Sequence, residues 1–294
     1  MSQAARFREL LRRDGMVVAP GAYDCITARL IERAGFEAVY MTGAGTAARY
    51  GYPDFGLVTM SEMVANAGLI ADAVDLPVIA DADTGYGNEL NVVRTVREYE
   101  KAGVAGIHIE DQGFPKKCGH LDDKEIVPRE DWLAKIRSAA SARRSPDFAI
   151  IARTDARAVA GFDEAVARSQ AALSAGADMA FLEAPQTMEE VAAVPRLVKG
   201  PCLLNVVRGG KTPALDLGEA ERMGYKLAIV PGLLIKSVVG ICEGMLAELR
   251  DTRRHPVPVK EITVRQTFQI FGADEWDALR SRFRDGDPKR RAAE

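Results

Sequence analysis

The sequence predicts a (β/α)8 barrel of the TIM type, within the α/β class, from two features of its pattern. Short apolar segments bounded by turn residues alternate with longer segments of helical apolar spacing, which is typical of a parallel sheet. Four helical segments end at a glycine three residues before the next strand, namely Gly35, Gly103, Gly176 and Gly224. Glycine is the usual residue at the left-handed position that ends a helix, so this recurrence indicates repeated β/α units.

Eight apolar segments are the candidate strands, at residues 16–19, 38–41, 78–81, 106–110, 149–153, 179–183, 202–206 and 227–230. Helical spacing is clearest at residues 25–34, 61–74, 89–102, 129–140 and 163–175. Eight units close into a barrel with its site at the carboxyl ends of the strands. An open doubly wound sheet is the alternative, and the lack of a GxGxxG motif after the first strand disfavours it.

The chain after residue 231 has a different pattern, with a long helical stretch, a proline-rich connector at 255–258 and another helical segment at 262–271. The charged tail at 284–294 is expected to fray. We expect a single barrel domain over residues 1–294, with the barrel at about 16–250 and a helical extension at about 251–294. Helices left over after a barrel closes usually pack on a partner subunit, so we expect an oligomer.

Composition points to a protein with a small-molecule ligand. The 294 residues are 47% hydrophobic and carry a net charge of -3, so no basic excess indicates a nucleic-acid partner. Residues 1–14 are charged and lack the apolar segment of a secretion signal, and no apolar run approaches the ~20 residues that span a bilayer. Four scattered cysteines, Cys25, Cys118, Cys202 and Cys242, show no CxxC spacing. Free thiols in a reducing cytoplasm are expected, with no membrane partner.

Polar side chains follow five of the predicted strands. They are Asp81 and Asp83, Glu110 and Asp111, Arg153 and Asp155, Glu183, and Asn205. Carboxylates that converge at one barrel mouth repel one another unless a cation lies among them, and hard oxygen ligands favour Mg²⁺ or Mn²⁺. Arg153 would then supply a fork for a substrate carboxylate.

Each of these residues also has a structural interpretation. Asp81 and Asp83 could simply cap the next helix, since Asp is a favoured N-cap residue. Asp155 could brace Arg153. His108, inside a predicted strand, is interpreted as a satisfied core histidine.

The segment Lys116-Lys117-Cys118-Gly119-His120, the thiol loop, packs two ammonium groups, a thiol and an imidazole into five residues. A thiol beside cations is expected to have a lowered pKa and to serve as a nucleophile or a proton donor. The alternative is a basic surface loop with an incidental cysteine.

Several motifs together resemble the isocitrate lyase and phosphoenolpyruvate mutase superfamily. They are the segments 40–45 (YMTGAG), 81–87 (DADTGYG), 108–112 (HIEDQ), the thiol loop, and 152–155 (ARTD). The resemblance spans about residues 17–271 and implies a Mg²⁺-dependent barrel enzyme, usually a homotetramer whose subunits exchange a C-terminal helix. The mutases lack a cysteine in the corresponding loop, so Cys118 favours the lyase branch.

Within the lyase branch, the chain length resembles the 2-methylisocitrate and 2,3-dimethylmalate lyases. The segment 209–213 (GGKTP) is similar to the alkylmalate lyases, which cleave dicarboxylates. Lys236 and Arg265 instead fall where methylisocitrate lyases carry arginines for a third carboxylate. Lys236 matches only in part, because an ammonium cannot form the bidentate fork of a guanidinium.

The resemblance also implies a role for each site residue. Asp81, Asp83 and Glu110 would hold the metal, partly through water, and Tyr40 or Asp54 would take the proton of the substrate's 2-hydroxyl. Cys118 would protonate the carbanion left by bond cleavage, with His120 beside it. Binding of substrate is expected from Lys116, Gly119, Arg153, Glu183, Asn205, Lys236 and Arg265, and from the backbone of Thr42, Gly43 and Ala44.

Other functions stay open at this stage. Oxaloacetate decarboxylase or hydrolase activity would use the same metal-bound site, and phosphonomutase chemistry is disfavoured by Cys118. A Schiff-base aldolase is disfavoured because no lysine lies at a predicted strand end. A barrel without catalytic activity that binds a dicarboxylate is the alternative outside the enzymes.

Overall fold

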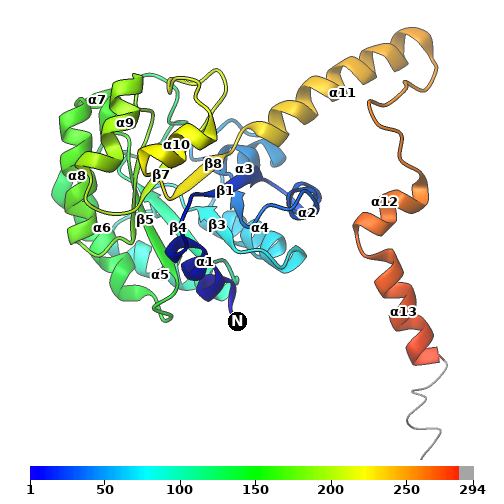
Figure 1. Ribbon diagram of the computed structural model, residues 1–294, viewed down its shortest axis with the longest axis horizontal. Helices are drawn as coiled ribbons and strands as arrows, with labels where there is room; N and C mark the ends of the chain where they lie inside the picture. The colour runs from blue at the N-terminus through cyan, green and yellow to red at the C-terminus, as the bar shows by residue number, and fades with distance from the viewer. Residues whose placement is uncertain (285–294) are drawn as a thin grey trace, which may run out of the picture. The chain divides into compact units, whose positions relative to one another are not determined.

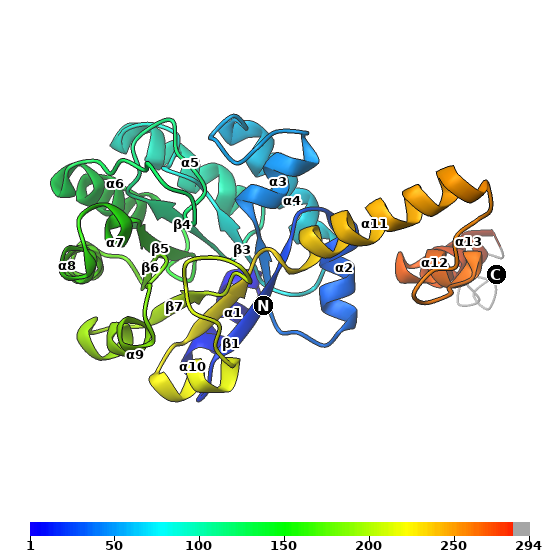
Figure 2. The ribbon, with the colours of Figure 1, turned by 90° about the horizontal axis from the view of Figure 1, so that it is seen from above.

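The computed structural model describes residues 1–284 and confirms the barrel. Eight strands lie in sequence order around a closed barrel, every neighbouring pair is parallel, and helices surround them (Figures 1 and 2). The last strand closes on the first through pairs such as Val17 with Leu227. The open-sheet alternative is therefore wrong.

The strands are β1 (Val17–Ala22), β2 (Val39–Met41), β3 (Val78–Asp81), β4 (Gly106–Glu110), β5 (Ala149–Thr154), β6 (Met179–Leu182), β7 (Cys202–Asn205) and β8 (Leu227–Val230). Each overlaps its predicted segment. The largest difference is in β1, which continues through Pro20 and Gly21 to Ala22. A Cβ on Gly21 would collide with the backbone of Pro231, so glycine is needed there for the close approach of the chain after β8.

The helices of the barrel are α1 (Gln3–Arg12), α2 (Cys25–Arg33), α3 (Gly43–Arg49), α4 (Met60–Ala73), α5 (Glu89–Lys101), α6 (Arg129–Ala142), α7 (Ala156–Val159), α8 (Phe162–Ser174), α9 (Met188–Leu197) and α10 (Leu217–Met223). The predicted helix stops are confirmed. Gly35, Gly103, Gly176 and Gly224 have φ of 85°, 88°, 108° and 101°, a conformation that favours glycine.

The N-terminal end of the barrel is closed by α1. Phe7 and Leu10 of this helix belong to the same buried cluster as Val17 and Ile79 at the beginning of their strands. A second buried cluster fills the space between the strands and the surrounding helices, around residues such as Trp132. The carboxyl ends of the strands are thus left for a site.

Strand register brings the polar residues of neighbouring strands together at that end. Asp81 on β3 pairs with His108 on β4, and Glu110 on β4 pairs with Arg153 on β5. Parallel strands all end at the same rim, so these four side chains belong to one small region.

The chain forms two compact units, residues 1–237 and 238–294. The boundary lies inside α11 (Leu233–Thr252), and the second unit also contains α12 (Val264–Ile270) and α13 (Ala273–Arg284). No residue of these three helices is buried. Apart from Arg284, the tail predicted to fray lies outside the described residues.

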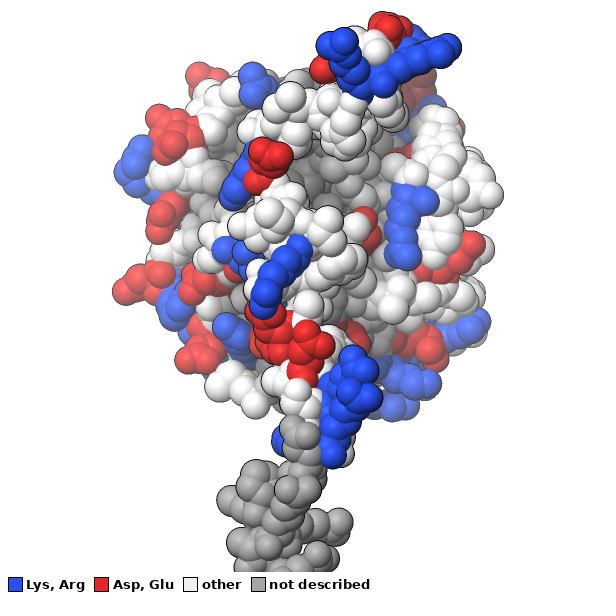
Figure 3. Space-filling view, turned by 90° about the vertical axis from the view of Figure 1, so that its right-hand side faces the viewer, with Lys and Arg blue, Asp and Glu red and all other residues white. Residues whose placement is uncertain are grey.

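Basic and acidic side chains are interspersed on the face of the molecule shown in Figure 3, so the described residues form no large patch of one charge there. Within residues 1–284, no helix combines the length and the apolar character needed to cross a membrane.

Candidate active site

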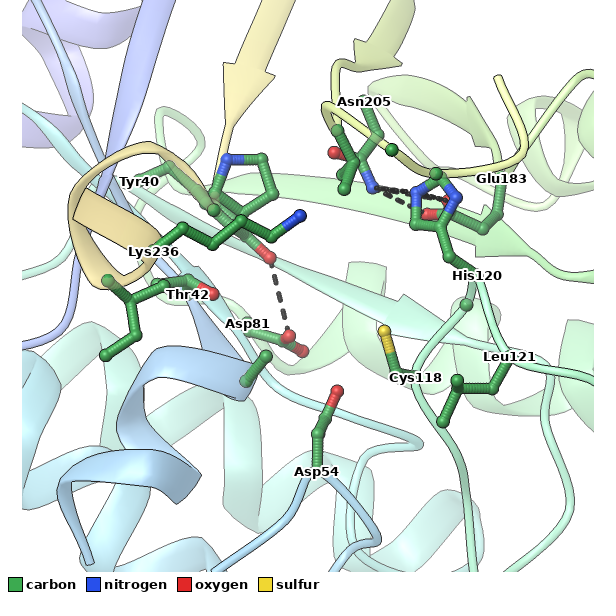
Figure 4. Close-up of a pocket in the computed structure, with 18 of the residues that line it drawn as sticks. Tyr40, Thr42, Asp54, Asp81, Cys118, His120, Leu121, Glu183, Asn205 and Lys236 are labelled. Atoms are coloured by element: carbon green, nitrogen blue, oxygen red, sulfur yellow. Dashed lines mark hydrogen bonds and ion pairs between the residues drawn. The ribbon is translucent and has the colours of Figure 1, made fainter. Parts of the chain in front are cut away.

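A cavity of about 310 Å³ opens at the carboxyl ends of the strands (Figure 4). Of the residues predicted for the site, twelve line it: Tyr40, Thr42, Ala44, Asp54, Asp81, Cys118, Gly119, His120, Arg153, Glu183, Asn205 and Lys236. The other predicted site residues of the barrel lie directly behind this lining. Gly43 lies between Thr42 and Ala44 in the sequence, and the remaining three contact lining residues: Asp83, Glu110 and Lys116. Arg265 is an exposed residue of α12, in the second unit.

The three predicted metal ligands are buried at the ends of β3 and β4. Asp81 lines the cavity, and its Oδ1 accepts the N–H of Asp83 at 2.9 Å. Glu110 is fully buried, and its Oε1 has no hydrogen-bond partner among the described residues. An unpaired buried carboxylate oxygen is costly, so this arrangement needs another donor or a cation.

This donor set fits Mg²⁺ held mainly through water. Within the described residues, no three His, Cys, Asp or Glu side chains converge closely enough to ligate one ion by themselves. Mg²⁺ commonly keeps several waters and binds protein through one or two carboxylates. Asp81 at the cavity wall would then be a direct ligand, with Asp83 and Glu110 acting through water.

Lys116 brings a positive charge to the same carboxylates. Its Nζ forms ion pairs with Asp54 and, at 2.7 Å, with Asp83 Oδ1. The residue is almost fully buried, and burial lowers its pKa, but Asp83 and Asp54 outweigh that effect and raise the pKa well above its usual value. Lys116 therefore ties the thiol loop to β3 and to Asp54.

Arg153 is less available than the sequence indicated. Its Nε donates to Asp155 Oδ2 at 2.9 Å and its Nη2 to Asp155 Oδ1 at 3.3 Å, so one side of the fork already holds a carboxylate. The Nη1 group pairs with Glu110 Oε2 at 3.0 Å. The interpretation of Asp155 as a brace for Arg153 is confirmed.

His120, Glu183 and Asn205 form one hydrogen-bonded group on the side of the cavity opposite Asp54 (Figure 4). The backbone N–H of Lys211 donates to His120 Nδ1 at 3.0 Å, so the proton of a neutral ring is on Nε2, which lies 3.1 Å from Glu183 Oε1. Asn205 Nδ2 donates to both Glu183 oxygens, at 3.2 and 3.1 Å.

Glu183 carries a negative charge in this group. Burial raises its pKa, but Arg153 and His120 outweigh burial and lower the pKa to about 2. An anion would repel a substrate carboxylate, so Glu183 is better suited to orienting His120 and Asn205 than to holding substrate oxygens itself. The oxygen Oδ1 of Asn205 has no hydrogen-bond partner among the described residues.

The prediction that the pKa of the Cys118 thiol is lowered is wrong. Burial raises the pKa of Cys118, and Asp54 and Glu183 add to this effect, while the backbone N–H of His120 opposes it. The charge of Lys116 is directed away from the thiol, since its Nζ pairs with Asp54 and Asp83. A protonated thiol at the cavity is a proton donor and not a thiolate nucleophile.

Tyr40 is also protonated. Burial, aided by Asp81, raises the pKa of Tyr40 well above its usual value. Its hydroxyl lies 2.8 Å from His108 Nε2 and 3.4 Å from Asp81 Oδ2. His108, interpreted from the sequence as a core histidine, is buried as expected but supports a cavity residue directly; its alternation within a strand gave no signal of that contact.

The backbone at 42–44 starts α3. The N–H of Thr42 already donates to the carbonyl of Ala22 at 3.0 Å, so it does not serve the predicted carboxylate cradle. The N–H groups of Gly43 and Ala44 lie in the first turn of the helix, where helical acceptors are lacking. A Cβ on Gly43 would collide with the Asp81 carboxylate, so glycine is required next to this site.

The apolar wall of the cavity could not be predicted from the sequence. Leu121, Val207, Pro231 and Ile235 come from the loops after β4, β7 and β8 and from α11. Apolar residues in connecting segments carry no periodic signal, so only the closed barrel reveals that they face one cavity.

Comparison with known proteins agrees with this architecture. The family model described as phosphoenolpyruvate phosphomutase matches residues 7–250. The chain is 54% identical over 232 residues to 2,3-dimethylmalate lyase of Eubacterium barkeri, covering 79% of this chain and 80% of that protein. It is 42% identical over 288 residues to 2-methylisocitrate lyase of Aeropyrum pernix, covering 98% and 91%.

Solved structures give the same result. A crystal structure of 2,3-dimethylmalate lyase matches with a TM-score of 0.90 at 40% identity, covering 95% of this chain and 94% of that one. Oxaloacetate acetylhydrolase with 3,3-difluorooxalacetate matches with a TM-score of 0.92 at 38% identity, covering 98% of both. Phosphonopyruvate hydrolase with oxalate and Mg²⁺ matches with a TM-score of 0.87 at 31% identity, covering 96% and 99%. With its barrel, its carboxylate rim and a family match over most of its length, the chain belongs to the phosphoenolpyruvate mutase/isocitrate lyase superfamily, among relatives that are carbon–carbon lyases.

Proposed function

We propose that the protein is a Mg²⁺-dependent lyase that cleaves 2,3-dimethylmalate, or a close 2-methyl-2-hydroxy dicarboxylate, into pyruvate and a second carboxylate. The observation that carries the proposal is the position of the protonated Cys118 thiol at a cavity that Asp54 and Asp81 also line (Figure 4). Lyase chemistry needs both a proton acceptor and a carbon-protonating acid around one substrate, and this cavity offers both.

The charges and walls of the cavity favour a dicarboxylate with methyl groups. Leu121, Val207, Pro231 and Ile235 offer apolar surface for methyl groups. Among the described lining residues, the Arg and Lys side chains are Arg153 and Lys236, and Lys236 Nζ donates to the carbonyl of Arg208 at 2.7 Å. A tricarboxylate such as 2-methylisocitrate would need a further cation, which Arg265 would have to supply.

The two candidates for the base, Tyr40 and Asp54, differ in whether they can accept a proton. Tyr40 is held as a phenol by its raised pKa, so it can donate a hydrogen bond but cannot accept a proton near neutral pH. Asp54 is a carboxylate at the cavity, paired with Lys116. We therefore assign proton removal to Asp54, directly or through water, and assign Tyr40 to binding an oxygen.

In the proposed reaction, bound Mg²⁺ supplies the Lewis acidity that lowers the pKa of the substrate's 2-hydroxyl. Asp54 accepts the hydroxyl proton, the oxygen becomes the carbonyl of pyruvate, and the C2–C3 electron pair stays on C3 as the bond breaks. Cys118 donates its thiol proton to C3, which completes the second carboxylate, propanoate in the case of 2,3-dimethylmalate. The N–H groups of Gly43 and Ala44 would bind the pyruvate carboxylate, and the Arg153 N–H groups that are not bonded to Asp155 or Glu110 would bind the other.

The second candidate is hydrolysis or decarboxylation of oxaloacetate. The structural similarity to oxaloacetate acetylhydrolase, with a TM-score of 0.92, supports this candidate. That reaction would start from a 2-oxo acid at the same metal site, but oxaloacetate has no methyl groups to occupy the apolar wall.

We also propose a cytoplasmic homotetramer in which neighbouring subunits exchange their C-terminal helices. The support is the set of exposed apolar residues on α11 to α13, including Leu246, Phe268, Trp276 and Phe283. A set of large apolar side chains exposed on helices without a buried face is typical of a subunit interface.

The experiment compares rates for 2,3-dimethylmalate, 2-methylisocitrate and oxaloacetate with Mg²⁺ and with Mn²⁺. The proposal expects the dimethylmalate rate to exceed the other two by at least tenfold. A higher rate with 2-methylisocitrate, lost in an Arg265→Ala variant, would move the protein to the tricarboxylate lyases. Turnover of oxaloacetate alone would support the second candidate.

A further inference from the structure

Lys124 is a buried lysine that neither lines the cavity nor takes part in the proposed reaction. It lies four residues after His120 in the connection between β4 and α6, and it is 8% exposed. Lysine is rarely buried unless its charge is paired, so its partners indicate what it does.

The Lys124 ammonium joins the thiol loop to the strand rim. Its Nζ donates to the carbonyl oxygen of Gly119, inside the thiol loop, and to Asp155 Oδ1 at 2.6 Å. Asp155 is the same carboxylate that accepts from Arg153 Nε at 2.9 Å. One buried anion thus holds both the loop lysine and the arginine of the cavity.

Gly119 lies directly against these groups. A Cβ on Gly119 would be 2.5 Å from Arg153 Nη2 and 2.7 Å from Glu183 Cγ, so the loop backbone packs on the cavity side chains. Cys118 precedes Gly119, and the position of its Sγ therefore depends on where the Gly119 peptide is held.

The other contacts of the thiol loop differ from this one. Lys116 reaches Asp83, close to Asp81, and His120 reaches Glu183, so both of these contacts are to groups at the cavity itself. Lys211 pairs with Asp122 at the surface, where Asp122 is 84% exposed, and exposed pairs contribute little. Two contacts hold the loop from outside the cavity lining. The buried Gln112 side chain accepts from the N–H of Lys117 at 3.0 Å and donates to its carbonyl at 2.8 Å, and Lys124 donates to the carbonyl of Gly119, the residue next to Cys118.

We propose that Lys124 is a positioning residue: its bond to the Gly119 carbonyl, anchored on Asp155, holds the thiol loop closed and places the Cys118 thiol at the substrate carbon. The proposal rests on the proposed lyase function for the role of Cys118. It does not rest on that function for the closure of the loop, which can be measured without turnover.

The test uses the full-length protein with Lys124→Met, which keeps the aliphatic stem and removes the charge. Alkylation of Cys118 by iodoacetamide is followed by mass spectrometry of its peptide, with Mg²⁺ and oxalate present. Oxalate is the probe because a related hydrolase binds it with Mg²⁺. In the wild type, oxalate with Mg²⁺ is expected to slow alkylation at least tenfold, and in Lys124→Met less than threefold.

Turnover of 2,3-dimethylmalate gives the second readout. Lys124→Met is expected to lower kcat at least tenfold while KM changes less than threefold, because the substrate contacts remain and the acid is displaced. Lys124→Arg keeps a charged donor beside Asp155 and is expected to recover most of the protection and of kcat. Asp122→Asn removes the exposed ion pair of the same connection and is expected to match the wild type in both readouts.

The proposal would be overturned if Lys124→Met kept the wild-type kcat and the wild-type protection of Cys118 from alkylation. It would also be overturned if Lys124→Met and Lys124→Arg lost kcat and protection to the same extent. Should the Met variant fail to fold by circular dichroism, the Arg variant decides: retained protection supports the proposal, and its loss in a folded variant contradicts it. Absence of lyase turnover in the wild type would count against the proposed function alone, since alkylation still reports closure.

Discussion

At the scale of single residues, the assignment of chemistry depends on protonation. Cys118 is the acid in this account because burial keeps its thiol protonated, although the cations around it in the sequence indicated the opposite. Sequence neighbours are poor guides to electrostatics in a loop, because the charges of Lys116 and Lys124 are directed to carboxylates that follow the strands β3 and β5.

A Cys118→Ser variant is expected to lose turnover by about 10²–10⁴-fold, the usual contribution of a positioned general acid. Its hydroxyl is a much weaker acid than the thiol. Oxalate binding, measured by calorimetry in Mg²⁺, should stay within about threefold of the wild type, since Gly43, Ala44 and Asp81 are unchanged. Retained turnover would remove Cys118 from its role.

Glu183 gives a pH-dependent prediction for stability. Its pKa in the folded protein, about 2, is below the usual 4.5, so the folded state binds fewer protons and gains stability above pH 4.5 that is lost as pH falls toward 2. Guanidinium unfolding should therefore show a wild-type advantage over Glu183→Gln at pH 7 that shrinks at pH 3. An equal difference at both pH values would show that the charge of Glu183 contributes no stability.

At the scale of elements, the strands and helices follow from local patterns, and the loops do not. The glycines that end helices and the apolar strand segments together predicted the barrel, because both signals repeat along the chain with the β/α units. The strand-end residues Asp81, Glu110 and Arg153 could be predicted because every strand ends at the same rim. The brace of Asp155 on Arg153 was foreseen as an alternative, but the Lys124 contact was not, because nothing in a loop sequence indicates which strand its side chain will reach.

Gly119 tests how closely the thiol loop packs. In Gly119→Ala the added methyl would overlap Arg153 Nη2 and the Glu183 side chain, both held in buried ion pairs. We expect kcat for 2,3-dimethylmalate to fall at least tenfold and oxalate with Mg²⁺ to lose its protection of Cys118 from alkylation.

Gly103→Ala is a control outside the site. It introduces the same methyl group at a positive φ with open space around it, so turnover should be retained and only the stability should fall. Normal turnover in Gly119→Ala would mean that the loop does not close as described.

At the scale of the whole molecule, the second unit has no buried residue in its described helices, and this is the observation behind the proposed assembly. The sequence predicted helices there and an oligomer, but one chain cannot define which surface covers them. The chain has two tryptophans, of which Trp132 is fully buried and Trp276 is 71% exposed. Trp276 is therefore a reporter for assembly.

The proposed assembly predicts that Trp276 is shielded at micromolar concentration. The emission difference between the wild type and Trp276→Phe should be blue-shifted and poorly quenched by acrylamide, and light scattering should give the mass of four chains. On dilution below the dissociation constant, the difference spectrum should shift red as the mass falls. A monomer mass with a fully quenchable Trp276 at all concentrations would contradict the assembly.

The reaction proposed for the cavity is metal-dependent cleavage of a carbon–carbon bond. The most direct test is to incubate the protein with 2,3-dimethylmalate and to quantify pyruvate and propanoate in Mg²⁺ and again in excess EDTA. We expect equal amounts of the two products in Mg²⁺ and neither product in EDTA. Absence of pyruvate in Mg²⁺, or equal release in EDTA, would contradict it.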